Sequence, residues 1–424
     1  MQFLRGSFYQ KKSSACELKI PHRIRSIRKM KKCRIAVIGV GQRGCHYAAM
    51  LAEHPQVELA ALCDCSPERL QAFAGELNLA DVPQFYTIED LFARCEFEAA
   101  IITVPDVLHA AVAVACCEAG KHIMLEKPMA PTADECRQII NAVRKNNTII
   151  QIGFVLRNHP VFSRVIEIAR SGALGQILNI ASAENIGVMH GASYMRRWHR
   201  KVANSGGFLL AKCSHDIDII ATAANSQVKR VAAFGSLDHF TADKLKHEYC
   251  SECPDQSCRY RFGGEFVRMS ETEKSAPSQK GFDLCVYNSD KDIIDHEVAI
   301  MDFANGIKAS FALNLFAEVP KRTINICGTE GILYADTAEE CIHIHYSNGK
   351  PYEKIECKPK DSSGHGGSDK GFLDDFVDCL INRTRPRADY MAGLASTVIG
   401  NAIEKAMQSG TVVAIAAEEY NLEQ

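Results

Sequence analysis

The segment AKCSHDID, residues 211–218, sets Lys212, Cys213, His215 and two aspartates between apolar stretches. Burying charged groups is costly unless they are paired or used, so these residues need a partner or a function. Their types suit four structures: a metal site, a thiol nucleophile with its base, a proton-transferring histidine, or a well-paired helix. The surrounding elements have to decide among these.

On a helix, Lys212, His215 and Asp216 lie at i, i+3 and i+4 and share one face. A lysine on that face disfavours a zinc site, because a cation repels a metal ion. Cys213 and His215 lie two positions apart and do not face each other, which disfavours a nucleophile pair. A histidine that titrates near neutral pH is suited to take a proton from a hydroxyl. We therefore expect His215 to handle a proton, with Cys213 in the core and Asp218 bonded to nearby backbone.

A second chemical pattern lies near the start of the chain, where the apolar segment 33–39 runs into Gly39-Val-Gly41-Gln-Arg-Gly44 and then into a helical pattern. Asp64 ends the next apolar segment, 20 residues beyond Gly44. Strand, glycine turn, helix and a distant acid are the arrangement that binds a dinucleotide, with the pyrophosphate at the helix N-terminus. An acid there repels a 2′-phosphate, which favours NAD over NADP. The predicted cofactor contacts are Gly39, Gly41, Gln42, Arg43, Gly44 and Asp64; a glycine-rich turn that binds nothing is the alternative.

Strands and helices continue to alternate, with strands predicted at 98–104, 121–127 and 148–154. This alternation predicts a parallel sheet, whose ligands bind beyond the carboxyl ends of the strands. The residues at or just after those ends are further predicted cofactor contacts: Val104, Pro105, His109, Glu126 and Lys127.

Lys127 follows a buried-looking strand and precedes a proline that restricts the backbone. Its ammonium could hold substrate oxygens and stabilise a hydroxyl that is losing its proton. A strand-end lysine paired with Glu126 or solvated is the alternative. Further on, SYMRRWHR (193–200) reads as an aromatic and basic loop, in which Arg197 and Trp198 could wall a sugar site. Core packing of Trp198 is equally open.

Four cysteines stand in and beside a polar insertion predicted at 239–283. Three have the spacing Cys250-x2-Cys253-x4-Cys258, and Cys285 follows at a distance. This spacing suits a small structural zinc site, which would offset the entropy of ordering the insertion. A polar insertion with reduced thiols is the alternative.

The composition bounds the class of protein. The 424 residues carry a net charge of −2, but residues 1–32 hold ten Lys or Arg and one acid, so the remainder is at −11. An acidic body argues against a nucleic-acid groove, and no apolar run is long enough to span a membrane. Eighteen cysteines without a secretory signal indicate free thiols in a reducing cytoplasm. The basic segment could be a leader, a disordered tail or, if Met30 is the true start, untranslated.

The ordered motifs AVIGVGQRG, VPDVLHA, EKP and SGG…HDID together resemble the Gfo/Idh/MocA oxidoreductases, the glucose–fructose oxidoreductase and inositol dehydrogenase family, from about residue 31 to 415. The resemblance implies a basic extension (1–31), a Rossmann domain with a parallel sheet (32–154), and a C-terminal α/β domain (155–424) with a large open, mostly antiparallel sheet. It also implies NAD-dependent oxidation of a sugar or cyclitol hydroxyl. Open sheets in the family commonly pair between subunits, which implies a homodimer or homotetramer.

The resemblance also assigns roles. Lys127 and His215 match the catalytic pair, and Arg157 matches a basic position near the cofactor. Many members carry an acid where this chain has Ala211, which suggests the LLAK…HD subgroup, with Lys212 facing the substrate alongside Arg197, Trp198 and Asp216. Two other functions remain open: a glycosidase or lyase that uses transient oxidation by NAD, and a non-catalytic protein that binds NAD or sugar.

Overall fold

The computed structural model describes residues 32–242, 247–262, 283–347, 349–359, 361 and 364–421. The predicted extension 1–31 lies outside the described residues, as do positions 243–246 and 263–282 of the predicted insertion.

The N-terminal half forms a six-stranded sheet in the order β3-β2-β1-β4-β5-β6, and every pair of neighbours is parallel. Apart from Arg34 and His122 near their starts, the central strands β1, β4 and β5 are apolar, because both faces of the sheet are covered. The strands are β1 (Cys33–Ile38), β2 (Val57–Cys63), β3 (Gln84–Phe85), β4 (Ala99–Ile102), β5 (His122–Leu125) and β6 (Ile150–Ile152). The expected parallel sheet is confirmed, and the two-residue β3 is an addition that no pattern predicted.

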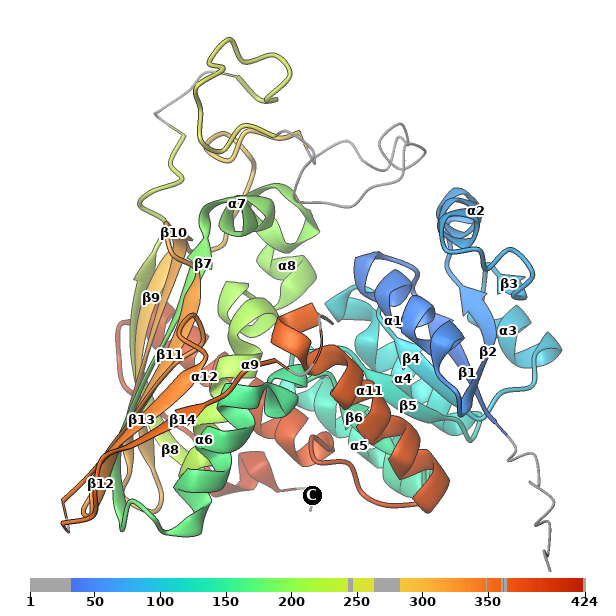
Figure 1. Ribbon diagram of the computed structural model, residues 1–424. Coiled ribbons are helices and arrows are strands. Elements are labelled where there is room, and N and C mark those ends of the chain that lie inside the picture. The colour runs from blue at the N-terminus through green and yellow to red at the C-terminus, as the bar shows by residue number, and fades with distance from the viewer. Residues whose placement is uncertain are drawn as a thin grey trace, which may run out of the picture. The chain divides into compact units, whose positions relative to one another are not determined.

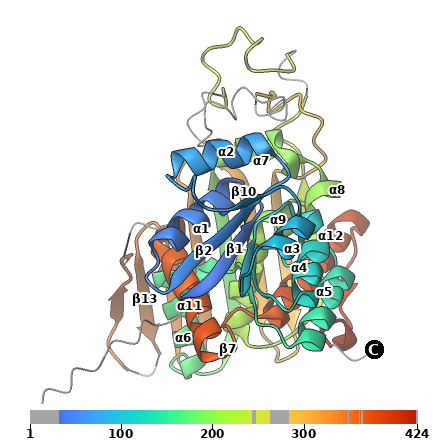
Figure 2. The same cartoon turned by 90° about the vertical axis from the view of Figure 1, so that its right-hand side faces the viewer.

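Helices cover both faces of this sheet (Figure 2). One face packs against α1 (Gln42–Glu53), α2 (Pro67–Glu76) and α11, a late segment of the chain (Gly364–Asn382). The other face packs against α3 (Ile88–Arg94), α4 (His109–Glu118) and α5 (Ala133–Asn146). The short turns η1 (Asp106–Leu108) and η2 (Val155–Asn158) follow β4 and β6, so they stand at the carboxyl edge of the sheet.

The C-terminal half forms a nine-stranded sheet in the order β14-β13-β12-β11-β7-β10-β9-β8-β15 (Figure 1). Only β7 and β10 are parallel; the other neighbours are antiparallel. The strands are β7 (Ile177–Gly187), β8 (Val228–Ser236), β9 (His296–Phe303), β10 (Lys308–Ala317), β11 (Lys321–Gly328), β12 (Gly331–Asp336), β13 (Cys341–Tyr346), β14 (Glu353–Glu356) and β15 (Val413–Ala414). The predicted fold class is therefore confirmed in both halves.

One face of the large sheet carries helices, chiefly α9 (Phe208–Ala224) and α12 (Tyr390–Ser409), which pack on each other and against β7 and β8 (Figure 1). The remaining helical elements are α6 (Pro160–Ser171), α7 (Val188–Arg196), η3 (Trp198–Arg200), α8 (Val202–Ser205) and η5 (Ala417–Tyr420). The AKCSHDID segment lies wholly inside α9, as predicted.

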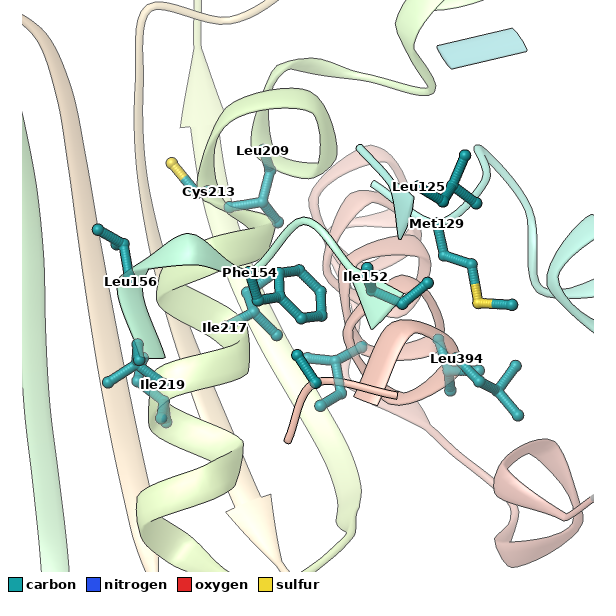
Figure 3. Packing of buried hydrophobic residues seen from close by; sticks show 14 of the residues in the cluster. Leu125, Met129, Ile152, Phe154, Leu156, Leu209, Cys213, Ile217, Ile219 and Leu394 are labelled. Carbon is teal, nitrogen blue, oxygen red and sulfur yellow. The ribbon is translucent and has the colours of Figure 1, made fainter. Parts of the chain in front are cut away.

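A continuous apolar cluster joins the edge of the parallel sheet to α9 and α12 (Figure 3). Ile152 and Phe154 meet Leu209 and Ile217 of α9 there, and all four are at most 2% exposed. Cys213 belongs to the same cluster and is fully buried, which confirms its predicted place in the core. Because packed cores resist displacement, this cluster holds the polar face of α9 at a fixed position near the sheet edge.

The segment 193–200 was expected to be a loop, and half of that prediction is wrong. Residues up to Arg196 belong to α7, and only the following residues form a turn. The helix packs closely on β10, because a Cβ at Gly191 would lie 1.8 Å from the carbonyl oxygen of Leu315. The mixed aromatic and basic pattern hid this packing, since Tyr194, Met195 and Arg196 are all buried.

Candidate active site

The glycine turn after β1 combines two packed positions with one open position. A Cβ at Gly39 would lie 2.7 Å from the Val104 nitrogen, and one at Gly44 would lie 2.0 Å from the Gly39 oxygen. Gly39 also has a φ of +89°, which side chains rarely adopt. At Gly41, by contrast, no atom of the described residues, apart from its chain neighbours, lies within 4 Å of the position of a Cβ. Open space at the N-terminus of α1, where Gln42 is exposed, fits a pyrophosphate.

Asp64 at the end of β2 is buried beside this turn. Its carboxylate accepts hydrogen bonds from the Val40 nitrogen at 2.8 Å and the Ser66 nitrogen at 2.9 Å. The sequence did not indicate its third partner, Arg69, whose Nη1 lies 3.2 Å from Oδ1. A guanidinium can bind a phosphate, so Asp64 alone does not decide between NAD and NADP.

Lys127 follows β5 and reaches α9. Its Nζ donates a 2.6 Å hydrogen bond to the Ala211 carbonyl, in the first turn of that helix. Asp106 of η1 is buried nearby, and burial raises its pKa to about 8 against the opposing charge of Lys127. The residue that sequence reasoning named as the electrostatic catalyst thus lies beside the helix that carries the proposed base.

Two predicted cofactor contacts, Arg43 and Glu126, form an ion pair with each other. The Arg43 Nε lies 2.8 Å from Glu126 Oε1, while its Nη1 lies 2.8 Å from Asp369 Oδ2 on α11. Its Nη2 donates to the Tyr47 hydroxyl at 2.6 Å. Burial opposes ionisation of Glu126, yet Arg43 and Lys127 lower the pKa of its carboxyl. The pair ties the end of β5 to α1 and α11, so it positions the loop that carries Lys127.

The loop after β4 holds three further predicted contacts. Val104 is half-buried and Pro105 is exposed, whereas His109 is fully buried. The His109 Nδ1 lies 2.7 Å from the Pro128 carbonyl oxygen and its Nε2 lies 3.0 Å from that of Val104. With both ring nitrogens facing carbonyl oxygens, His109 links the β4 and β5 loops rather than pointing to solvent.

His215 lies on α9 between the apolar cluster and a second histidine. Its ring centre is 6.1 Å from that of Phe154 and 5.9 Å from that of His365 on α11. Only 3% of the residue is exposed, and its Nδ1 has no hydrogen-bond partner among the described residues. Burial, followed by the charges of Lys127 and His365, lowers its pKa well below the usual imidazole range. His215 is therefore neutral at neutral pH and able to accept a proton.

Lys212 and Asp216 belong to a buried charge network that sequence reasoning missed. The Lys212 Nζ lies 3.6 Å from Glu184 Oε1 on β7. Arg322 on β11 contacts Glu184 and lies 2.9 Å from Asp216 Oδ1. Burial raises the pKa of Asp216 to about 6, against the pull of Arg322. Glu184 of strand β7 thus supplies a carboxylate close to Lys212, the residue that follows Ala211 on α9.

Arg157 makes a two-pronged ion pair with Asp218, with Nε 2.7 Å from Oδ2 and Nη2 2.5 Å from Oδ1. Asp218 was expected to bond backbone, and its described partner is instead this guanidinium. The pair joins η2 to α9. It orients the helix, and contact between Arg157 and a cofactor stays a prediction.

Trp198 lies in η3, half-buried, with its ring centre 3.7 Å from that of His199. Arg197 precedes it at the end of α7 and is also half-buried.

The four cysteines of the insertion line one small cavity together with Arg196. They are Cys250, Cys253, Cys258 and Cys285. The tryptophan is thus two residues from an arginine that contacts the cysteine cavity.

His365 and Asp369 are the other functional candidates that sequence reasoning missed. The His365 Nδ1 lies 2.9 Å from Asp369 Oδ1, and Asp369 Oδ2 also accepts from Arg43 and lies 2.9 Å from His46 Nε2. The segment 365–367 has three successive positive φ angles, 53°, 65° and 80°. The glycine-rich letters GHGG were the available signal, since such a turn can aim a histidine at a site.

Within the residues that the structure covers, no helix is both long and apolar enough to pass through a bilayer. All the cysteines it describes are free of disulfides.

Two family models match the chain. One describes an oxidoreductase family with an NAD-binding Rossmann fold and matches residues 33–154; the other describes the family's C-terminal α/β domain and matches residues 167–415. The Bacillus subtilis protein YteT, an oxidoreductase by name, is 24% identical over 382 residues, 82% of this chain and 88% of its own length. A glycosyl hydrolase family 109 protein of Shewanella pealeana is 30% identical over 162 residues, 36% of this chain and 35% of its length.

Among solved structures, levoglucosan dehydrogenase in complex with NADH superposes with a TM-score of 0.73 and 18% identity. The match covers 91% of this chain and all of that one. At this identity the likeness is one of fold.

Proposed function

Because the chain belongs to the Gfo/Idh/MocA oxidoreductase family, we propose that it is an NAD-dependent dehydrogenase. A hydride would pass between nicotinamide and the hydroxyl carbon of a sugar, a cyclitol or a derivative. The observation that carries this proposal is the approach of Lys127 to the helix of His215, next to a glycine turn with room for a pyrophosphate.

The residues proposed to hold NAD surround that turn. Gly39, Gly41 and Gly44 would let the backbone approach the pyrophosphate, and the Asp64 carboxylate would accept hydrogen bonds from ribose hydroxyls. Gln42, Val104 and Pro105 would line the same edge, while His109, Arg43 and Glu126 hold its loops in place. When bound, NAD supplies the hydride acceptor.

Lys127 and His215 divide the remaining work. The Lys127 ammonium has three donors, of which Ala211 takes one, so it can also hold the oxygen of a substrate hydroxyl. His215 is neutral because burial and Lys127 lower its pKa, so it can accept the proton of that hydroxyl. As the proton leaves, the positive charge of Lys127 stabilises the growing negative charge on the oxygen.

The substrate side would be formed by Lys212, Arg197 and Trp198. Lys212 is only 9% exposed and close to Glu184, so it offers a positioned ammonium rather than a free one. Asp216 would act through Arg322, which holds Glu184 in place. Arg157 would act through Asp218 by orienting α9.

The first test is titration of the purified full-length chain with NADH and NADPH, followed by the fluorescence of the reduced nicotinamide. We expect NADH to bind more tightly. The variant Arg69→Ala should weaken binding of NADPH more than binding of NADH, because only NADPH carries a phosphate on the 2′-oxygen of its adenosine ribose. If neither NADH nor NADPH binds, the proposal is overturned.

A second candidate is a glycosidase or lyase that oxidises its substrate transiently. The likeness to the family 109 glycosyl hydrolase favours it, although that match spans about a third of either protein. The two activities differ in redox balance: a dehydrogenase accumulates NADH in proportion to product, and a glycosidase releases product without net NADH. Ligand binding with no turnover, unchanged in Lys127→Ala, would instead indicate a non-catalytic binding protein.

We further propose a homodimer or homotetramer built on the open face of the large sheet. Phe234, Val298 and Ile300 are 74%, 51% and 55% exposed on adjacent strands β8 and β9. Exposed apolar patches of this kind mark interfaces. Light scattering after gel filtration should report an oligomer for the wild type and smaller species for Val298→Lys; a monomeric wild type would refute it.

The free thiols favour a cytoplasmic location, which localisation of a tagged full-length protein would check; export from the cell would refute it.

A further inference from the structure

The four cysteines named above come from two separate segments and meet at one small cavity, which holds about one water-sized sphere. Cys250, Cys253 and Cys285 are at most 7% exposed, and Cys258 is half-buried. None of these four thiols takes part in a disulfide with another described cysteine. Their convergence is therefore the feature to be explained.

Backbone contacts fix the two segments against each other. Tyr249 and Leu284 form an antiparallel bridge. Beside it, the Cys250 nitrogen donates to Asp283 O at 2.7 Å and the Cys285 nitrogen donates to Glu248 O at 2.7 Å. Cys253 turns back with its nitrogen 3.3 Å from Cys250 O. These bonds hold the thiol-bearing backbone in place without any contribution from the thiols.

Arg196 supplies an independent indication of what the cavity binds. This residue is 3% exposed and lines the cavity. Its guanidinium contacts the carbonyl oxygens of Leu284 and Tyr260, and its Nη2 lies 3.4 Å from Cys250 Sγ. It forms no ion pair with any carboxylate in the described parts of the chain. A buried cation without an anion is costly, so the cavity requires negative charge.

We propose that Cys250, Cys253, Cys258 and Cys285 bind one structural Zn²⁺ ion. Binding releases the four thiol protons and leaves a tetrathiolate centre with a net charge of −2, which Arg196 partly balances. The evidence for this zinc site does not depend on the proposed dehydrogenase activity.

A second group of side chains that could hold a cation lies at the start of β13. Glu339, Cys341 and His343 are the one trio of such side chains, among the residues described, whose ligand atoms all lie within 4.8 Å of one another. The four thiols must therefore close in on their ion. The β13 trio satisfies its polar atoms without a metal, because Cys341 Sγ lies 3.1 Å from His343 Nε2 and His343 Nδ1 lies 2.5 Å from the Tyr352 hydroxyl. In the described part of the chain, no buried charge without a partner lies beside this trio.

The zinc centre would brace the substrate side of the enzyme. Arg196 ends α7, directly before Arg197 and Trp198. The segment after Cys285 binds the same region, since Ser289 Oγ donates to Met195 O at 2.6 Å and Asp290 pairs with Arg200 at 2.5 Å. Holding the insertion therefore holds the turn that carries Trp198.

The test uses the full-length chain without a histidine tag, expressed with zinc in the medium and purified under reducing conditions. Elemental analysis should find about one zinc per chain. The double variant Cys250→Ser/Cys285→Ser should lose it. Two controls should keep it: Cys65→Ser, an exposed thiol, and His343→Ala in the competing trio.

A second measurement does not depend on variants that fail to fold. Wild-type protein stripped of metal by a chelator is titrated with Co²⁺, and the intense visible bands of tetrahedral cobalt thiolate should grow to one equivalent. Their absence, metal that is lost with His343 rather than with the cysteines, or iron with acid-labile sulfide in the protein would each overturn the proposal.

Discussion

At the residue scale, the proposed chemistry depends on keeping His215 neutral in a crowded positive environment. Burial contributes most, and the charges of Lys127, His365, Arg322 and Lys212 add to it, all lowering the pKa of the imidazole. A base with a lowered pKa stays unprotonated, and therefore competent, to a lower pH than a free histidine.

The pH dependence of kcat/KM should report the lowered pKa of His215. For the wild type, the acidic limb should fall below the usual imidazole range, because activity is lost only when His215 gains a proton. Replacing His365 by Asn removes a group whose positive charge in acid opposes that proton, so the limb should move to higher pH. A purely structural role for His365 would lower activity without moving the limb.

Removing the proposed base, His215, should lower activity more than replacing His365 does. His215→Ala should lower kcat by about 10²- to 10⁴-fold, the usual contribution of a general base. His345→Ala is the matched control, because His345 is exposed on β13, away from α9. Equal activity of the two variants would exclude His215 as the base.

At the scale of elements, the turn between β1 and α1 separates a folding requirement from a binding requirement. Gly44 has to be glycine because a Cβ there would meet the Gly39 oxygen at 2.0 Å. Gly41 has ordinary φ, −84°, and empty space where its Cβ would be. We therefore propose that its lack of a side chain serves a ligand rather than the fold.

Matched alanine variants should therefore behave differently. Gly41→Ala should unfold at the wild-type denaturant midpoint yet bind NADH at least about tenfold more weakly, since a methyl group intrudes on the pyrophosphate. Gly44→Ala should lower the midpoint itself, because backbone has to shift. Denaturant titration and NADH titration of both variants check this prediction. Unchanged NADH affinity in Gly41→Ala would show that the pyrophosphate does not bind at this turn.

Most of these elements could be predicted from local pattern. The apolar strands β1, β2, β4 and β5, the glycine turn and the helical placement of His215 all follow from periodicity and spacing. Glu184, Arg322 and His365 could not be predicted, because they reach α9 from β7, β11 and α11, far away in the chain. Only the tertiary pairing of strands brings those charges together, and α7 was missed because its burial depends on contact with β10.

At the scale of the whole molecule, buried titratable groups set the pH range in which the protein is stable. His109, His159 and His215 are among several buried histidines whose pKa burial lowers, to about 4 for His159. Two buried acids have the opposite shift: burial raises the pKa of both Asp106 and Glu297 to about 8.

The direction in which stability changes with pH depends on whether the folded or the unfolded chain binds more protons. Below about pH 6.5 the unfolded chain protonates these histidines while the folded protein does not, so stability is lost as pH falls. Between about pH 6.5 and 8 the folded protein still holds the protons of Asp106 and Glu297 that the unfolded chain has released, so stability falls as pH rises.

The free energy of unfolding, measured in urea across this range, should therefore peak between about pH 6 and 7. Glu297→Gln should flatten the alkaline side, because neither carboxylate oxygen of Glu297 has a hydrogen-bond partner among the described residues. Stability that keeps rising to pH 8, or an alkaline slope unchanged in Glu297→Gln, would contradict this account.

The most direct test of the central claim is the appearance of NADH absorbance when the full-length protein and NAD are mixed with a panel of sugars, cyclitols and their acids. The account predicts turnover on at least one of them. It also predicts loss of about 10²-fold or more in Lys127→Ala with NADH binding retained, and wild-type rates in Lys145→Ala, an exposed lysine on α5. Turnover that survives in Lys127→Ala, or product formed without any NADH, would contradict it.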